Sequence, residues 1–490
     1  MPNSSSSPTN RPSTFAERIG IGTRRRQDQI RDVLAEIEGR GLHSVRLACV
    51  DLHGVLRGKS LRADLIKDVF DSGLGLTSAV LMKDTGQNNV YPVWAAGAGL
   101  DRSWLTGAGD VIMVPDPTTF RVLPWADGSG WLLCDLFSPE GESVEFSTRA
   151  LCRRAEQALT DHGYEYRAGL EMEFHLYAVS SHSADTTRAP DAVGDLKLDH
   201  LHPGYVYLGE QRYDTIEPFL EILRADLHAI GAAPRSMELE LGPSQVELTF
   251  SPVGGLELAD QAVLVRSAIK QIARRNGLHA TFMGRPAFAQ SFSSGWHLHQ
   301  SLLDAETGSS CFPIDDGTTL SPIGRHYLAG LLDHASESCL LTTPTVTGYK
   351  RYRPNSLAPD RIGWSAQNRG AMLRIVGTDG DPATRIENRV GDSAANPYLY
   401  LASQMLCGLD GIEKGISPPS STDSPYAAES DPLLPRTLGE AIEVFRASGF
   451  YRDALGPLFV DYLATSKQAE WDRFLATVTD WEQREYFDLF

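Results

Sequence analysis

Residues 237–250 read MELELGPSQVELTF, and this stretch carries the clearest fold information in the chain. Apolar and polar residues alternate on both sides of Leu241-Gly242-Pro243-Ser244, a pattern typical of two β-strands joined by a turn. Alternate residues of a strand point to the same face, so Glu238 and Glu240 share one face, and Glu247 follows across the turn. The segment therefore predicts strands with carboxylates on one face and apolar side chains on the other.

Two further segments, GLEMEF at 169–174 and SGWHLH at 294–299, repeat this alternation. Their polar positions are Glu171, Glu173, His297 and His299. Carboxylates combined with imidazole suit Mg²⁺ or Mn²⁺, whereas the absence of thiolate pairs disfavours a structural zinc site. A single Glu-x-Glu pair is usually the solvated face of an antiparallel strand. Three such segments with strongly apolar neighbours favour a metal site over that interpretation.

The order of the predicted elements indicates the fold class. Helices are predicted from near Ser147 to Gly163 and from about Leu258 to Asn276. Between them, a capping box formed by Asp214 and Glu217 predicts the start of another helix. Strands lie between them without a strict strand–helix–strand alternation, which favours an α+β fold. We expect a disordered N-terminal extension at 1–27, a small strand-dominated domain at 28–140 and a larger domain at 141–490.

Composition limits the classes of function. Apolar residues make up 42% and charged residues 22% of the chain, which is a globular balance. The net charge of −18 disfavours non-specific binding to nucleic acid or to an anionic membrane surface. The six cysteines contain no CxxC pair, and no apolar run approaches the length of a membrane span. These features predict a cytoplasmic protein without disulfides.

An arginine cluster stands out in this acidic chain. Residues 351–389 contain seven arginines against four acidic residues. The arginines are Arg351, Arg353, Arg361, Arg369, Arg374, Arg385 and Arg389. Guanidinium groups bind phosphate and carboxylate through paired hydrogen bonds, and metal ligands beside them are what phosphoryl transfer requires. The cluster alone could equally be a solvated surface rich in ion pairs.

The usual phosphate-binding loops are missing. Gly54–Ser60 resembles a Walker loop but is one residue too short, because His53 stands where the first glycine should be. No HExxH or GxSxG motif occurs. A nucleotide would therefore be held through metal ions and arginines.

Taken in order, several segments resemble the glutamine synthetase superfamily, over nearly all of the chain after about residue 28. The segments are Val45–Lys59, Val114–Thr118, Gly169–Phe174, Gly242–Glu247, Ala280–Met283, Gly295–His299, Asn368-Arg369, Arg385–Arg389 and Ala395–Leu399.

That resemblance implies a small N-terminal β-grasp domain and a large catalytic domain with a curved antiparallel sheet flanked by helices. It implies a homo-oligomer, commonly a dodecamer of two hexameric rings, with active sites between neighbouring subunits. ATP and at least two divalent ions, Mg²⁺ or Mn²⁺, would bind at each site. One ion would be held by Glu173, Glu240 and Glu247, and the other, on the ATP phosphates, by Glu171, His297 and Glu387.

The resemblance also implies roles for the remaining candidates. Arg369, Arg374 and Arg385 would neutralise phosphates, and His299 and Ser301 would lie near the nucleotide. Arg351 and Arg389 would hold the glutamate carboxylates and the acyl phosphate. Arg369, Arg389 and Asp84 are the residues expected to act in catalysis. The implied reaction phosphorylates the γ-carboxylate of glutamate with ATP, after which a nitrogen nucleophile displaces phosphate.

Departures from the family pattern bear on that nucleophile. Glutamine synthetases carry a flap glutamate shortly after the arginine that matches Arg351, and here that place is taken by Leu357. An early aspartate that holds ammonium could survive as Asp84, and the Asn-Gly before the histidine strand reads Phe292-Ser293. Losing an anion disfavours a small cation and leaves room for an organic amine. The chain therefore resembles the γ-glutamyl-amine ligases of amine catabolism. An ammonium-dependent glutamine synthetase and a non-catalytic relative remain the alternatives.

Overall fold

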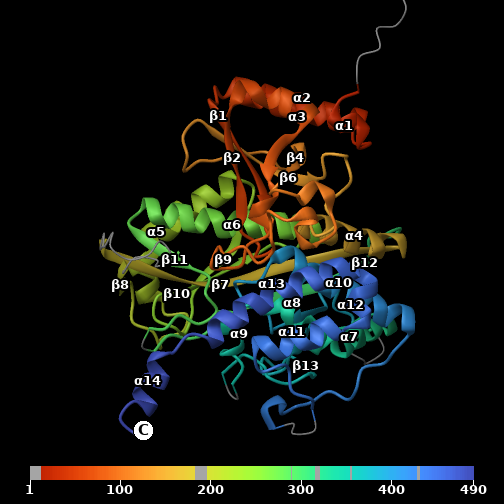
Figure 1. The fold of residues 1–490 in the computed structure, drawn as a ribbon. Coiled ribbons are helices and arrows are strands. Elements are labelled where there is room, and N and C mark those ends of the chain that lie inside the picture. The colour runs from red at the N-terminus through yellow and green to blue at the C-terminus, as the bar shows by residue number, and fades with distance from the viewer. Residues whose placement is uncertain (1–12, 183–195, 289, 315–319, 354–355, 428–430) are drawn as a thin grey trace, which may run out of the picture. The chain divides into compact units, whose positions relative to one another are not determined.

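The computed structural model describes residues 13–182, 196–288, 290–314, 320–353, 356–427 and 431–490. These residues form two compact units. The first comprises residues up to Cys49 together with Arg57–Ser78 and Trp94–Val144, and the second comprises Val50–Leu56, Ala79–Val93 and Glu145–Phe490. Both units combine helices with sheets (Figure 1). The mixed composition agrees with the α+β expectation, while the β-grasp assignment stays a prediction.

The first unit is built on a mixed sheet with the strand order β2-β1-β6-β4-β3 and β5 paired to β6. Strand β1 runs parallel to β6, and β6 runs antiparallel to β4. Its strands are β1 (Ser44–Val50), β2 (Leu56–Arg62), β3 (Leu74–Thr77), β4 (Asp110–Pro115), β5 (Arg121–Val122) and β6 (Ser129–Phe137). Its helices are α1 (Phe15–Arg18), α2 (Arg24–Gly39) and α3 (Ile66–Ser72).

Part of the predicted N-terminal extension is helical. Thr14 forms a capping box with Glu17 at the start of α1, and the Thr23 side chain caps α2. These caps satisfy amide groups that a helix terminus otherwise leaves unpaired. The prediction that residues 1–27 are disordered is therefore wrong for Phe15–Arg18 and for the start of α2 at Arg24. Residues 1–12 lie outside the described part of the chain.

The second unit is built on a larger sheet with the order β13-β14-β15-β12-β7-β10-β9, with β8 and β11 also paired to β7. All of these pairs are antiparallel except β13 with β14. The strands are β7 (Tyr164–His182), β8 (Leu196–His200), β9 (Pro234–Leu239), β10 (Gln245–Phe250), β11 (Leu278–Thr281), β12 (Trp296–Asp304), β13 (Trp364–Ala366), β14 (Leu373–Val376) and β15 (Arg385–Asn388).

Several helices of the second unit pack beside this sheet, whereas the C-terminal helix lies apart from it (Figure 1). The helices of this unit are α4 (Thr148–Asp161), α5 (Glu210–Ala229), α6 (Gly255–Arg275), α7 (Pro322–Asp333), α8 (Ala335–Thr342), α9 (Val346–Tyr349), α10 (Pro397–Lys414), α11 (Leu438–Ala447), α12 (Gly449–Leu455), α13 (Pro457–Leu475) and α14 (Asp480–Tyr486). Helix α10 contacts α4, α6 and α7. No helix among the described residues is long and apolar enough to cross a membrane.

The long strand β7 organises this unit (Figure 1). Leu170, Met172 and Phe174 are almost completely buried, because every second residue of the strand faces the core. The intervening positions, Glu171 and Glu173, face the opposite side, as the alternation in the sequence predicts. Burial of the apolar face thus fixes which face carries the carboxylates.

One predicted helix start is wrong. Helix α5 begins at Glu210 with Gly209 as its N-cap, so Asp214 and Glu217 lie inside the helix. The amides of Arg212 and Tyr213 both donate to the Gly209 carbonyl at 3.0 Å, which starts the helix about one turn earlier than a capping box at Asp214 would.

Candidate active site

The strand register gathers the predicted polar residues on one face of the larger sheet. Glu247 on β10 lies opposite Glu173 on β7, and Glu171 on β7 lies opposite His297 on β12. His299 on β12 lies opposite Glu387 on β15, and Glu387 lies opposite Arg374 on β14. Directly opposed residues of antiparallel strands share a face and approach closely. Segments far apart in the sequence thereby bring carboxylates, imidazoles and a guanidinium group together on one face of the sheet.

Glu173 is held by its neighbours. Its Oε2 atom accepts hydrogen bonds from the Gln245 side-chain amide at 2.9 Å and from the Gly295 backbone amide at 2.9 Å. Gln245 also donates to the Ser293 carbonyl at 3.0 Å, and its Oε1 accepts from the Gly242 amide. Gln245 therefore orients Glu173 and ties it to the turn after β9. Gln245 belongs to the Gly-Pro-Ser-Gln-Val-Glu motif, but the motif alone does not indicate that Gln245 positions Glu173.

Two histidines converge on Glu171. His297 Nδ1 lies 2.7 Å from Glu171 Oε1, and His299 Nε2 lies 3.0 Å from Glu171 Oε2. Arg385 Nε donates to His299 Nδ1 at 3.1 Å, so a neutral His299 carries its proton on Nε2 and donates it to Glu171. Burial would raise the pKa of Glu171, but His297 and His299 lower it well below its usual value. Glu171 is thus an anion at neutral pH.

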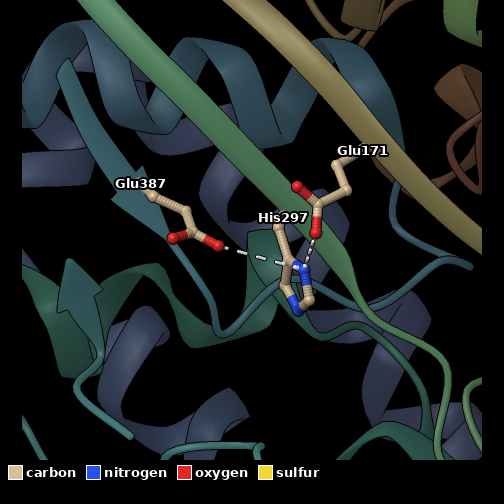
Figure 2. A group of neighbouring side chains, drawn as sticks. All are labelled: Glu171, His297 and Glu387. Carbon is tan, nitrogen blue, oxygen red and sulfur yellow. Dashed lines mark hydrogen bonds and ion pairs between the residues drawn. The ribbon is translucent and has the colours of Figure 1, made fainter. Parts of the chain in front are cut away.

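Glu387 is fully buried and shared between two arginines. Arg374 Nη1 lies 2.9 Å from Glu387 Oε2, and Arg389 pairs with Glu387 Oε1. His297 Nδ1 lies 4.0 Å from the same carboxylate (Figure 2). Burial would raise the pKa of Glu387, but Arg389 and His297 lower it. Among the described residues, the buried Nε atoms of Arg374 and Arg389 have no hydrogen-bond partner.

Most of the predicted residues line one cavity of about 510 Å³. These are Glu171, Glu173, Glu240, Glu247, His297, Arg351, Leu357, Arg369, Arg374 and Arg389. A larger cavity of about 790 Å³ in the same unit has no carboxylate among its described lining residues. The smaller cavity is therefore the candidate active site.

The remaining predicted residues do not line the cavity. Glu387, His299 and Arg385 adjoin it through the contacts above, and Ser301 lies on β12 two positions beyond His299. Asp84 pairs instead with Arg473 and accepts a hydrogen bond from the Asn88 amide at 2.9 Å. The structure therefore does not bring Asp84 to this cavity, and its catalytic role stays a prediction.

The donor set fits divalent ions. Glu171, His297 and Glu387 offer ligand atoms within 4.8 Å of one another, and so do Glu173, Glu247 and His297. Glu240 lines the cavity but belongs to neither group. Burial, followed by nearby carboxylates, raises the pKa of Glu173 to about 8, of Glu240 to about 7 and of Glu247 to about 12. Such crowding of carboxylates is relieved when a cation replaces the shared protons.

Divalent-ion affinity should consequently rise with pH. Raised pKa values mean that Glu240 and Glu173 keep protons near neutral pH, and a binding cation must displace them. We expect the apparent Kd for Mn²⁺ to fall about tenfold per pH unit for each displaced proton, from below pH 7 to about pH 8. Titration calorimetry at three pH values across this window measures the slope. The Glu173→Gln variant should have a shallower slope, and a pH-independent Kd of the unmodified chain would contradict the prediction.

Other cavity residues had no assigned role in the sequence interpretation. Tyr207 and Leu208 come from the segment between β8 and α5, which contains no readable motif. The sequence marks Glu238 only as part of the alternating strand, and Phe292 only as a departure from the family pattern. A tyrosine in a loop gives no periodic signal, so Tyr207 could not have been placed without the fold.

Comparisons with known proteins agree with this geometry. The family model for the glutamine synthetase catalytic domain matches residues 145–486. A γ-glutamylanilide synthase from Acinetobacter sp. is 41% identical, covering 97% of this chain and 99% of its own. A γ-glutamylethanolamide synthetase from Streptomyces coelicolor is 31% identical, covering 94% of this chain and 96% of its own. The solved structure of a GmaS–ADP complex matches with a TM-score of 0.78 at 25% identity, covering 93% of this chain and 99% of that chain.

Proposed function

The chain belongs to the glutamine synthetase family, and on that premise we propose that it is an ATP-dependent ligase that joins the γ-carboxylate of glutamate to an organic amine. The observation that carries this proposal is the meeting of two carboxylate–imidazole groups with four arginines at one cavity, which Glu387 adjoins and the other members line. Metal ligands and guanidinium groups together neutralise the charge that a triphosphate and a dicarboxylate bring. Relatives that form γ-glutamyl amides support the reaction class.

One divalent ion would be held by Glu171, His297 and Glu387. The other would be held by Glu173, Glu240 and Glu247, although Glu240 lies outside the cluster that Glu173 and Glu247 form with His297. Mg²⁺ or Mn²⁺ suits such oxygen-rich sites. When bound, the ions supply Lewis-acid polarisation and neutralise phosphate charge. The imidazole of His297 lies between the two groups, with Nδ1 2.7 Å from Glu171 and Nε2 3.9 Å from Glu173.

The chain's own cations would position both substrates. Arg369, Arg374 and Arg385 would neutralise the nucleotide phosphates, with His299 and Ser301 nearby. Arg351, which is almost completely buried and donates to the Val390 carbonyl at 3.0 Å, would bind a glutamate carboxylate together with Arg389. The γ-carboxylate would take the terminal phosphoryl group of ATP. The amine nitrogen would then form the C–N bond as the C–O bond to phosphate breaks, and the nitrogen would lose one proton.

Leu357 supports an organic amine over ammonium. Its side chain lines the cavity and is half exposed, and its backbone has a φ of 61°. An exposed leucine cannot stabilise a small cation, because it offers no acceptor for ammonium N–H groups. An ammonium-dependent glutamine synthetase is the alternative, and a non-catalytic relative is disfavoured because the carboxylate–imidazole groups are intact. We also propose a homo-oligomer, most simply a dodecameric ring assembly, which sedimentation would test.

Hydroxylamine tests the ligase proposal without knowledge of the amine. This small nucleophile traps an acyl phosphate as a hydroxamate, so glutamate, ATP and Mg²⁺ should yield γ-glutamyl hydroxamate together with ADP and phosphate. We expect product only when all components are present, and we expect chelation of divalent ions to abolish it. Absence of glutamate-dependent ADP and hydroxamate formation under every divalent ion tried would refute the ligase. If it forms, a higher kcat/KM for ammonium than for every amine would favour the glutamine synthetase alternative.

A further inference from the structure

The larger cavity of the second unit, about 790 Å³ in volume, is separate from the candidate active site. None of its described lining residues also lines the active-site cavity. Helix α6, strand β11 with the two residues that follow it, and helix α8 supply much of its lining. A volume of this size lies within the range of cavities that bind small organic molecules. The cavity is therefore a candidate site for a second ligand.

Much of the surface of this cavity is apolar. Leu340 and Leu341 from α8, Leu399 from α10 and Leu463 from α13 line it, together with Phe282 after β11. No aspartate or glutamate occurs among its described lining residues. An accessible apolar surface favours a ligand with an apolar body, because their contact removes both apolar surfaces from water.

One side of the cavity is basic. Arg266, Lys270 and Arg274 follow one another at intervals of four residues on α6, so they lie on the same face of the helix, and all three line the cavity. Like charges at this spacing repel one another and destabilise the helix unless something neutralises them. In a chain with a net charge of −18, three cations at one cavity without a described lining carboxylate favour an anionic ligand.

Two of these cations are available to a ligand. Arg266 is already engaged, because its guanidinium group donates to the backbone carbonyls of Gly54, Ser393 and Ala395. Lys270 and Arg274 are exposed, and neither side chain has a hydrogen bond or an ion pair with another described residue. An anionic group beside α6 could therefore accept a charge-assisted hydrogen bond from each of them.

The other ionisable lining residues do not reverse this charge balance. Lys467 on α13 pairs with Glu470 at 3.0 Å. Burial, followed by a neighbouring lysine in each case, lowers the pKa of His53 and of His279, so both imidazoles are neutral at pH 7. Burial, followed by the guanidinium group four residues earlier, also lowers the pKa of Lys270. An anion beside Lys270 would oppose both effects and keep its ammonium group charged.

We propose that this cavity binds an anionic amphiphile, which is an apolar body carrying one carboxylate or phosphate group. The apolar body would lie against Phe282 and the leucines of α8, and the anionic group would accept hydrogen bonds from Lys270 and Arg274. Carboxylate and phosphate share this chemistry, since both accept hydrogen bonds from ammonium and guanidinium groups. Because the two cavities share no described lining residue, the amphiphile would not compete with anions bound by the active-site arginines.

Matched eight-carbon probes test the proposal on the full-length chain by titration calorimetry. Octanoate and octanamide share the same alkyl chain, but only octanoate is an anion at neutral pH. We expect saturable binding of octanoate, with a Kd at least about tenfold lower than that of octanamide. Octyl phosphate distinguishes the head groups, because tighter binding than octanoate assigns a phosphate ligand and weaker binding assigns a carboxylate. Octanamide binding as tightly as octanoate would overturn the proposal.

Variants connect the binding to this cavity. Combining Lys270→Gln with Arg274→Gln should raise the Kd of octanoate about tenfold or more, because both charged donors are lost. Two controls should leave that Kd unchanged: Arg275→Gln, an exposed position of α6 outside the lining, and Arg369→Gln, in the active-site cavity. An unchanged Kd in the double variant, or a Kd raised only by Arg369→Gln, would overturn the proposal. Sedimentation identifies the assembly present in each titration, and octanoate binding only to dissociated subunits would assign the cavity to a subunit contact instead.

Discussion

Replacement of Glu173 by alanine is expected to lower kcat by at least about 1000-fold, which corresponds to about 4 kcal/mol of lost transition-state stabilisation. Glu173 lies within the ligand group that includes Glu247 and His297, so its replacement removes one of three candidate ligands. The variant should also bind Mn²⁺ more weakly, because one anionic ligand is lost. Rates of hydroxamate formation and a Mn²⁺ titration measure the two effects.

The fold should survive this replacement, because the side chain faces the cavity and not the core. Its loss leaves the Gln245 and Gly295 donors without their acceptor, which costs about 1–3 kcal/mol of unfolding free energy each if water does not replace it. Glu165→Ala on the same strand is the matched control, since Glu165 is exposed and pairs only loosely with Arg167 at 3.4 Å. Rates of Glu173→Ala near those of the control would remove Glu173 from the metal assignment.

The Arg389→Met variant is expected to lose both activity and stability. Methionine preserves much of the buried volume but leaves Glu387 with Arg374 as its remaining arginine partner. Breaking a buried ion pair from one side typically costs about 3–5 kcal/mol of unfolding free energy. Loss of the proposed contact between Arg389 and the acyl phosphate should also lower kcat/KM for glutamate about 100-fold or more. Chemical denaturation and steady-state kinetics measure these two quantities.

Arg452→Met provides the comparison for that variant. Arg452 pairs with Asp461 at 2.7 Å, but both side chains are considerably more exposed than Arg389 and Glu387. Exposed pairs contribute only about 0–1 kcal/mol. If Arg389→Met lowered the free energy of unfolding by only about 0–1 kcal/mol, Glu387 would not depend on Arg389.

Period-two alternation predicted the polar face of the three central strands, because that signal is local and the opposite face is buried. Partners across the sheet could not be predicted in the same way. Glu171 meets His297 only because β7 pairs with β12, more than a hundred residues further along the chain. Their association came from family resemblance and not from spacing.

Non-local contacts also explain the other features that could not be predicted, or were predicted wrongly, from the sequence. The sharing of Glu387 by two arginines depends on the register of β14 against β15. The presence of Tyr207 and Leu208 at the cavity depends on a loop whose backbone amides bond to the carbonyls of Leu239 and Leu241. Helix α5 begins at Glu210, and its N-cap Gly209 provides no side-chain hydrogen bond to the first turn. In each case tertiary structure decided between local options that the sequence left open.

The position of Glu387 between Arg374, Arg389 and His297 has a thermodynamic consequence. A cation bound to this carboxylate competes with both guanidinium groups for the same oxygens and so frees them for an incoming anion. Cation and nucleotide should therefore bind synergistically, each increasing the affinity for the other by the same factor.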